Sequence, residues 1–425
     1  MGEAPSKQPE RLEIETLERI SLVEETNLLL PRGQLSDEQA MALSSDRRFT
    51  LDWPNPANGF QFCLRSNGWV GHLPVGEAIL VVEPKVAAAK IFAMLELAYK
   101  LKGFEILEGE TFVEALEDIF ERIAHILAKR VLDRSRKGLY RSYVDRSDDL
   151  QFVRGRIDIR GNLRSALCGE PRLRCQYQEL TADIEDNVIL LWALHLASRL
   201  GFKRDDVRRN VRQAHRTLIG DVSLDRRSGK DCIGRFYHRL NDDYQPMHGL
   251  CRFLLEHAGP AISVGEHRFL PFAVNMPNLF ESFVAEWLAL NLPDELSVDP
   301  QYKAKLDSNA DLEFHVDLVV RDRASHKPLC ILDTKYKLGE SVNEADIQQV
   351  VAYAVELGVD QAFLVYPSAM ARRVRAKVGD VKVESIAFDV ASDFAVSGKA
   401  LLSAVSFNGA SGLGDDGESR VVYAI

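Results

Sequence analysis

Apolar and polar positions alternate with a period of two near residue 317, and an apolar run follows a short polar stretch. Alternation of this kind predicts a half-buried strand. A continuous apolar run predicts a strand buried on both faces, in the middle of a sheet. The two segments together predict a β-hairpin. The alternating residues are Phe314, Val316, Leu318 and Val320, and the run is Leu329, Cys330, Ile331 and Leu332.

Helical and strand patterns also alternate around this hairpin in the last third of the chain. Helical spacing predicts helices over residues 278–290 and 344–357. Strand patterns lie near residues 297–302, 362–366 and 381–388. This succession predicts a mixed sheet with helices on both faces, which can bury a core of its own.

The first and middle thirds of the chain carry different patterns. From residue 12 to about 86, short apolar segments separated by Gly and Asn predict strands and turns, and a helix is predicted over 87–101. The middle third is mainly helical, with a glycine-punctuated hairpin or loop over 140–177. We therefore predict an α/β multi-domain protein: a β-rich N-terminal module (1–105), a helical middle region (106–265) and a C-terminal α/β domain (266–425). The predicted middle helices cover 110–132, 183–200, 205–219 and 245–257.

Composition adds limits to this picture. The chain has 425 residues, 46% hydrophobic and 27% charged, which is ordinary for a globular protein. The first 15 residues lack the apolar core of a signal peptide, so we expect a cytoplasmic protein that does not enter a membrane. The six cysteines form no C-x-x-C pair, which argues against a zinc ribbon and a disulfide framework.

The net charge of −10 does not indicate nucleic-acid binding, but a nuclease needs only a local basic surface. Three basic clusters lie at residues 129–141, 203–216 and 372–377. Each is equally well explained as a solvated helix face.

Candidate chemistry lies at the end of the apolar run. Asp333 and Lys335 are two residues apart on one predicted strand and therefore point to the same side, and Asp317 on the partner strand can face them. Two carboxylates and an ammonium group suit phosphodiester hydrolysis, because carboxylate oxygens bind Mg²⁺ and a lysine can steady a nucleophile or developing charge. The simpler explanation is a solvated strand end with ordinary surface charges.

Three further residues are candidates for the same site. Glu281 heads an apolar column on the 278–290 helix, where it either binds metal or stabilises the helix dipole. Gln349 and Tyr353 lie one helical turn apart and share a face. They could orient Lys335 or a phosphate, or they could simply form the polar edge of a packed helix.

This arrangement resembles the PD-(D/E)xK nuclease core, and within it the chain is similar to the McrC family, the endonuclease subunits of McrBC-type modified-cytosine restriction systems. The site signature is Asp317, D-x-K at 333–335, a preceding helical Glu281 and Q-x-x-x-Y at 349–353. Segments along most of the chain add to the likeness: VVEPKV, IFAMLELAY, FVRGRIDIRGNLR, CQYQELTADIEDNVIL, NLFESFVAEWL and QQVVAYA.

The resemblance implies a C-terminal PD-(D/E)xK (restriction-endonuclease-like) domain and a Mg²⁺-dependent DNA endonuclease. Asp317, Asp333 and Glu281 would bind metal, Lys335 would activate or position water, and Gln349 with Tyr353 would support the site. It also implies a hexameric McrB-like AAA+ GTPase partner that docks on the β-rich module, and double-stranded DNA as substrate. The chain lacks G-x-x-x-x-G-K-[ST], so GTP would be bound by the partner.

Two alternatives remain open. The chain could be a non-catalytic adaptor that bridges an AAA+ ring and DNA, although an adaptor has no need to keep two aspartates and a lysine together. It could also be a stand-alone repair nuclease of the same superfamily. Metal-dependent cleavage with and without the partner and GTP separates the adaptor from the nuclease. A neighbouring gene for an AAA+ GTPase argues against the stand-alone enzyme.

Overall fold

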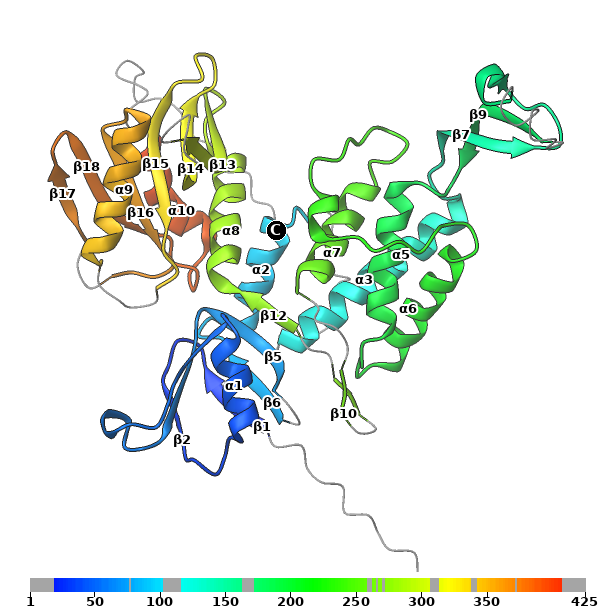
Figure 1. Cartoon of the computed structure of the whole chain (residues 1–425). Coiled ribbons are helices and arrows are strands. Elements are labelled where there is room, and N and C mark those ends of the chain that lie inside the picture. The colour runs from blue at the N-terminus through cyan, green and yellow to red at the C-terminus, as the bar shows by residue number, and fades with distance from the viewer. Residues whose placement is uncertain are drawn as a thin grey trace, which may run out of the picture.

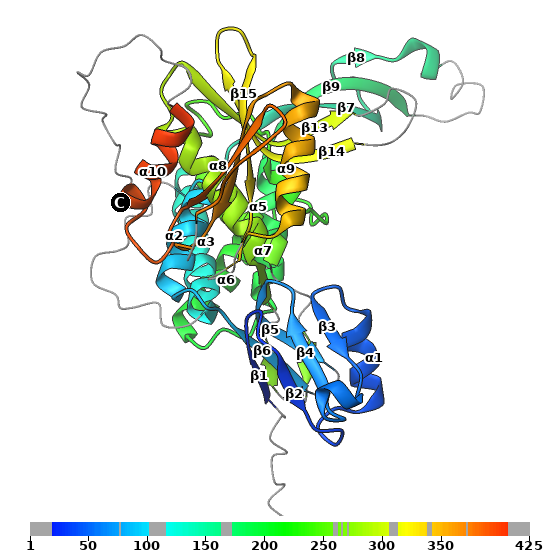
Figure 2. The ribbon, with the colours of Figure 1, turned by 90° about the vertical axis from the view of Figure 1, so that its left-hand side faces the viewer.

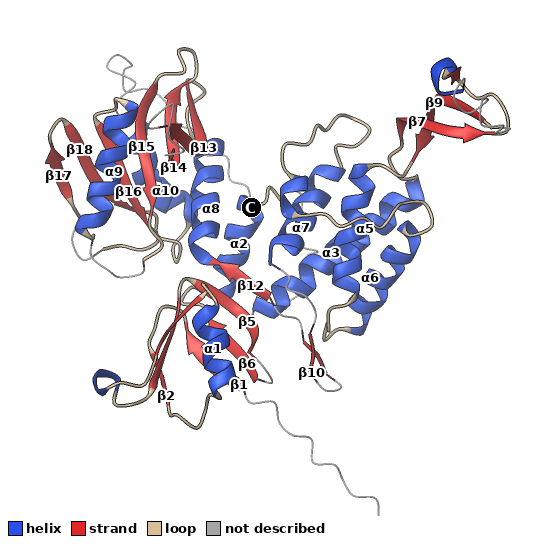
Figure 3. Cartoon of the chain, in the orientation of Figure 1, coloured by secondary structure: helices blue, strands red, loops and turns tan. Residues whose placement is uncertain are grey.

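A computed structural model of the chain describes ten ranges of residues, which form three regions (Figure 1). A β-rich module, a helical region and a C-terminal α/β domain follow one another along the chain, as Figure 3 shows by element type. No helix in the described ranges is long and apolar enough to cross a membrane. The described ranges are 19–75, 78–101, 116–162, 172–257, 262–264, 267–269, 272–305, 313–337, 342–370 and 373–406.

The β-rich module contains two sheets and a short helix. One sheet has the order β1-β6-β5-β12 and the other β2-β4-β3. The helix α1 (Asp37–Ser45) corrects our prediction of strand and turn in this segment: a capping box between Ser36 and Gln39 starts a helix too short to show a clear apolar period. The strands are β1 (Arg19–Val23), β2 (Leu28–Leu30), β3 (Phe49–Asp52), β4 (Phe62–Ser66), β5 (Trp69–Val75), β6 (Ala78–Glu83) and β12 (Phe272–Asn275).

The strand β12 returns to this module from far along the chain. It pairs antiparallel with β5, with Asn275 opposite Trp69. Its last residue also caps the next helix, α8 (Met276–Asn291), because the Asn275 side chain accepts a hydrogen bond from the backbone N–H of Asn278. The N-terminal sheet is therefore continuous with the first helix of the C-terminal domain. The limits 1–105, 106–265 and 266–425 stay predictions.

Helices dominate the middle region. The long helix α3 buries one apolar stripe, which contains Ile119, Ile123 and Leu127, against its neighbours. The helix α2 precedes this region and packs against α8. The bounds are α2 (Ala88–Ala98), α3 (Leu116–Lys137), α5 (Glu185–Ser198), α6 (Asp205–Leu218) and α7 (Tyr244–His257), with short 3₁₀ helices at Pro56–Asn58 and Gly229–Cys232.

A small three-stranded sheet projects from the end of the helical region, at the upper right of Figure 1. Its strands β7 (Ser142–Leu150) and β9 (Leu173–Thr181) pair antiparallel along their whole length, and β8 (Arg156–Ile157) adds to β9. Of the two predictions for 140–177, a hairpin or a loop, the described residues of this segment agree with antiparallel strands. A separate two-stranded ribbon joins β10 (Ile262–Val264) to β11 (His267–Phe269).

The C-terminal domain is a six-stranded mixed sheet in the order β13-β14-β15-β16-β18-β17. The helix α9 (Glu344–Leu357) covers one face, while α8 and α10 (Phe394–Ser406) cover the other, as the turned view in Figure 2 shows. This confirms the predicted sheet with helices on both faces. The strands are β13 (Leu296–Lys305), β14 (Glu313–Asp322), β15 (Pro328–Thr334), β16 (Gln361–Tyr366), β17 (Arg375–Val378) and β18 (Val381–Ala387).

Two apolar cores hold these regions. One runs from the β-rich module through the helices to the α8 face of the C-terminal sheet. The other lies between that sheet and α9 and includes Val319, Ile331 and Val350. The apolar run of β15 contributes to both cores, because its Leu332 belongs to the first and its Ile331 to the second. The β15 strand is therefore central, as its sequence predicts.

Candidate active site

Strand pairing brings Asp317 to the end of β15. The β14–β15 register places Leu318 opposite Leu332, so Asp317 stands one step further along, beside Asp333. Thr334 donates two hydrogen bonds to Asp317 Oδ2, from its backbone N–H at 2.7 Å and from its hydroxyl at 2.8 Å. One oxygen of Asp317 is thereby fixed to the partner strand, and the other oxygen is left for further contacts.

Asp333 and Lys335 form an ion pair at the same strand end. The Lys335 ammonium lies 2.7 Å from Asp333 Oδ2. Asp333 is only 1% exposed, and its Oδ1 has no hydrogen-bond partner among the described residues. The backbone N–H of Lys335 donates to Val365 O at 2.8 Å, which extends the β15–β16 pairing by one residue and holds the lysine in place.

The helix α9 supplies a second contact to the lysine. Lys335 Nζ donates to Gln349 Oε1 at 3.1 Å, and Gln349 Nε2 donates to the Tyr353 hydroxyl at 2.7 Å. The Tyr353 ring in turn packs edge-on against Phe314 of β14, with ring centroids 5.0 Å apart. The structure therefore joins Gln349 and Tyr353 to the lysine in one chain of hydrogen bonds.

Glu281, on α8, lies within the electrostatic reach of the same groups. Its pKa is raised to about 7, mainly by burial and then by the nearby carboxylate of Asp317, while a hydrogen bond with Gln301 works in the opposite direction. Gln301 lies at the step of β13 opposite Asp317 and has a left-handed backbone, with φ of 50°. This conformation is uncommon for a residue other than glycine. The sequence offers no signal for Gln301, because a glutamine within a strand pattern looks ordinary.

The crowded carboxylates shift one another's protonation. Burial, and next the charge of Asp317, raise the pKa of Asp333 to about 6. Burial works to lower the pKa of Lys335, but the neighbouring carboxylates, led by Asp333, outweigh it and raise that pKa. The lysine therefore stays an ammonium ion, and the site holds more carboxylates than cations. Groups whose pKa values are shifted in this way by burial and by neighbouring charges are typical of functional sites.

These groups suit a divalent cation in part. Mg²⁺ often binds only one or two protein carboxylates and completes its coordination with waters and phosphate oxygens. Asp333, which has a buried oxygen without a hydrogen-bond partner, and the neighbouring Asp317 could supply these carboxylates. Within the described ranges, no three His, Cys, Asp or Glu side chains form a ready ligand cluster. The donors present are therefore Asp317 and Asp333, with Glu281 hydrogen-bonded to Gln301 nearby.

An open cleft of about 590 Å³ reaches this strand end. One wall is the segment from Thr334 to Lys337, and the other is the β-rich module, including Arg65. Behind it, Tyr336 donates a hydrogen bond to the buried Glu24 at 3.4 Å. The lysine of the D-x-K motif is therefore reachable from solvent through a space shared by two regions of the chain.

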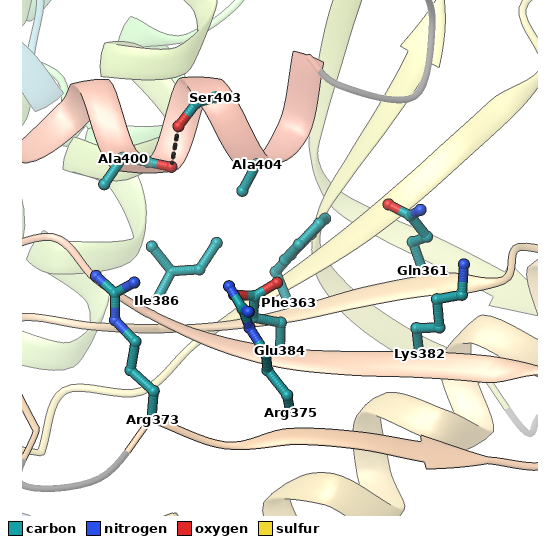
Figure 4. Close-up of a pocket in the computed structure, with 10 residues that line it drawn as sticks. All are labelled: Gln361, Phe363, Arg373, Arg375, Lys382, Glu384, Ile386, Ala400, Ser403 and Ala404. Carbon is teal, nitrogen blue, oxygen red and sulfur yellow. Dashed lines mark hydrogen bonds and ion pairs between the residues drawn. The ribbon is translucent and has the colours of Figure 1, made fainter.

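A second cavity of about 370 Å³ lies on the α10 face of the sheet, over β16, β17 and β18 (Figure 4). Its floor is apolar, with Phe363 and Ile386, and its rim carries Arg373 and Arg375. Arg375 is paired with Glu384 at 2.9 Å. The lining includes neither of the aspartates nor the lysine of the D-x-K cluster, so the cluster at the end of β15 remains the candidate active site.

The three basic clusters fall on different elements. Residues 129–141 include the end of α3, and residues 203–216 include α6, where Arg209, Arg212 and Arg216 are exposed along one side. The cluster at 372–377 is not a helix face, because residues 375–377 belong to the edge strand β17. Charged edge strands resist unwanted pairing with other chains, which gives this cluster a structural explanation.

Fold and site together define a multi-domain α/β protein with a carboxylate–lysine cluster at the end of a central strand. Comparison with known proteins gives the family. Residues 64–367 match the family described as McrBC 5-methylcytosine restriction system component. The chain belongs to this family, as the McrC-like motifs predicted.

Two known proteins illustrate the likeness. The type IV methyl-directed restriction enzyme EcoKMcrBC of Escherichia coli K12 is 22% identical over 274 residues, which cover 60% of this chain and 74% of that protein. A chain in the refined half-complex of Thermococcus gammatolerans McrB AAA+ hexamers with bound McrC is 17% identical and has a TM-score of 0.51. That match covers 92% of this chain and 99% of the other, and it shows a shared fold.

Proposed function

We propose that this chain is the Mg²⁺-dependent DNA endonuclease subunit of a GTP-dependent, McrBC-like restriction complex, and that its C-terminal domain is a PD-(D/E)xK nuclease. The observation that supports this most is the meeting of Asp317, Asp333 and Lys335 at one strand end beside an open cleft. Membership of a restriction-system family supports the same reading.

Each residue of the cluster has a role in this proposal. Asp317 and Asp333 would hold Mg²⁺, with Glu281 completing the acidic set directly or through water. The bound ion would polarise the phosphate and make a coordinated water more acidic. Lys335 keeps its proton and would position the attacking water or offset the developing negative charge. Gln349 and Tyr353 would hold the lysine in place.

We also infer a partner and a substrate. The similar structure contains McrB AAA+ hexamers with bound McrC, and the E. coli relative is a methyl-directed restriction enzyme. This chain would bind a hexameric AAA+ GTPase, stimulate its GTP hydrolysis and cleave double-stranded DNA that contains modified cytosine, in the cytoplasm. The β-rich module remains the region that we expect to dock on the partner.

Cleavage by the assembled complex tests the proposal. With the AAA+ partner, GTP, Mg²⁺ and DNA containing methylated cytosine, Asp333→Ala and Lys335→Ala should each lower the cleavage rate by more than about 100-fold. Partner binding and GTPase stimulation should remain, because neither needs the nuclease cluster. Lys327→Ala is the matched control, since this exposed lysine lies in the loop before β15.

Two outcomes would contradict the proposal. Normal cleavage by either variant would remove the cluster from catalysis. A wild-type complex that binds DNA and hydrolyses GTP but does not cut would favour the adaptor alternative.

A further inference from the structure

The cleft beside Lys335 has a wall that belongs to the β-rich module. Strands β3 and β4 present one face to it, because alternate residues of these strands are buried on the other side of the sheet. Leu64 and Ser66 are fully buried, whereas Arg65 between them is exposed. Arg65 pairs across the strands with Thr50, and both line the cleft. The module therefore places a cation in the same space as the end of β15.

Several contacts hold this wall against the C-terminal domain. The backbone N–H of Met276 donates to Gly68 O at 2.9 Å. Gly68 also packs tightly on Pro277, because a Cβ at position 68 would lie 2.8 Å from the proline ring. On the opposite side, Tyr336 reaches the buried Glu24. The cleft is therefore a fixed feature between two packed regions.

The charges of the cleft leave one cation uncommitted. Lys335 is paired with Asp333, and Lys337 with Asp346 at 2.7 Å. Two carboxylates line the cleft. Glu25 is paired with Lys85 at 3.3 Å. Asp52 lies two positions along β3 from Thr50, the residue opposite Arg65, and forms no ion pair with Arg65. None of the described ion pairs of the cleft lining includes Arg65. Arg65 is exposed and lines the cleft, so its guanidinium is available for an anion that enters.

We propose that this cleft is a subsite for the DNA strand beside the scissile phosphate, in which Arg65 binds a backbone phosphate. The inference rests on the proposed nuclease function, since it takes its ligand from the substrate of that reaction. Arginine binds phosphate oxygens through paired N–H groups, and phosphate contacts set the position of a strand without reading its sequence. The volume of about 590 Å³ is within the ordinary range of ligand pockets, roughly 300–1,000 Å³. The N-terminal module would thus help to position DNA for cutting by another domain.

A native thiol reports on this subsite. Cys63 lines the cleft and is partly exposed, whereas the other described cysteines are buried. Alkylation of the full-length chain by iodoacetamide, followed peptide by peptide with mass spectrometry, should be at least fivefold slower at Cys63 when a DNA duplex is bound. The alkylation rate of Cys63 does not depend on DNA cleavage, so it is measured in EDTA, which prevents cleavage. An unchanged rate at a DNA concentration that saturates binding would overturn the inference.

The role of Arg65 is tested by measuring the DNA concentration that gives half-maximal protection of Cys63 in variants of Arg65. Arg65→Ala should raise this concentration about tenfold, equivalent to roughly 1.4 kcal/mol. It should also reduce the slope of log affinity against log salt by about 0.9, the value for one lost phosphate contact. Arg65→Lys should recover part of the loss. The control is Arg32→Ala, an exposed arginine of the same module that lies outside the cleft lining.

The outcomes separate the two proposals. If the complex cuts DNA but Arg65→Ala changes neither protection nor the salt slope, the nuclease function stands and the subsite fails. If Cys63 is protected and Arg65 matters but the wild-type complex does not cut, the cleft binds DNA and the nuclease function fails.

Discussion

The hydroxyl of Tyr336 donates a hydrogen bond to the carboxylate of Glu24, although 312 positions separate the two residues in the sequence. Tyr336 directly follows the lysine of the D-x-K motif, and Glu24 directly follows the first strand of the β-rich module. Both side chains are buried. The N-terminal module is thus in contact with the strand end that carries the candidate site.

This contact predicts a pH-dependent stability. Burial raises the pKa of Glu24 to about 7 from an ordinary value of 4.5. The folded state therefore favours the protonated acid, and the resulting stability is present below pH 4.5 and is lost as the pH rises through 7. Glu24→Gln imitates the neutral acid. Its free energy of unfolding, measured by thermal unfolding, should equal that of wild type at pH 4.5 and exceed it at pH 8 by roughly 3 kcal/mol at most.

The control is Glu83→Gln, because Glu83 is exposed and lies on the neighbouring strand. It should show no such difference. Equal melting temperatures of wild type and Glu24→Gln at pH 8 would mean that burial does not raise the pKa of Glu24.

The ion pair of Lys335 and Asp333 predicts that removing the lysine destabilises the protein, and that a second substitution at Asp333 restores the lost stability. Lys335→Ala leaves a buried carboxylate without its cation, so the free energy of unfolding in EDTA at pH 8 should fall by about 3 kcal/mol. Adding Asp333→Asn removes the buried charge and should restore most of the loss. Denaturant unfolding measures both variants. If the double variant is as unstable as Lys335→Ala, the ion pair does not explain the cost.

Tyr353 is predicted to act as a positioning residue through Gln349. Tyr353→Phe removes the hydroxyl that receives the Gln349 amide and should slow single-turnover cleavage about fivefold, equivalent to roughly 1 kcal/mol. Combined with Gln349→Ala, the variant should be no slower than Gln349→Ala alone, because both act on one chain of hydrogen bonds. Additive losses would assign the tyrosine an independent role.

Packing of α10 on α8 gives a prediction about the fold. A Cβ at Gly398 would lie 2.0 Å from the ring of Trp287, so Gly398→Ala should destabilise the protein by about 1–3 kcal/mol and alter tryptophan fluorescence. Gly220→Ala is the control, because no atom lies within 4 Å of a Cβ at that position. Equal stability of the two variants would contradict the close contact of the two helices.

The sequence by itself determined most elements of the C-terminal domain. The apolar run 329–332 identified a central strand, since a strand buried on both faces needs apolar side chains at consecutive positions. The helix over residues 344–357 has the predicted limits, with a side-chain cap from Asn343 at its start and Gly358 at its end. The period of two also predicted that Asp333 and Lys335 point to the same side, and the backbone hydrogen bond from Lys335 to Val365 continues the strand pairing one residue past β15.

Only the tertiary structure decided which distant groups meet. Glu281 lies near the aspartates because α8 packs on the sheet, and Gln301, at the step of β13 opposite Asp317, forms a hydrogen bond with Glu281. Neither relationship is local. The return of β12 to the N-terminal sheet, and with it the cleft that contains Arg65, depends on pairing between segments about 200 residues apart. Local patterns fix the period and direction of side chains, whereas contacts between remote segments depend on how the whole chain buries its apolar surface.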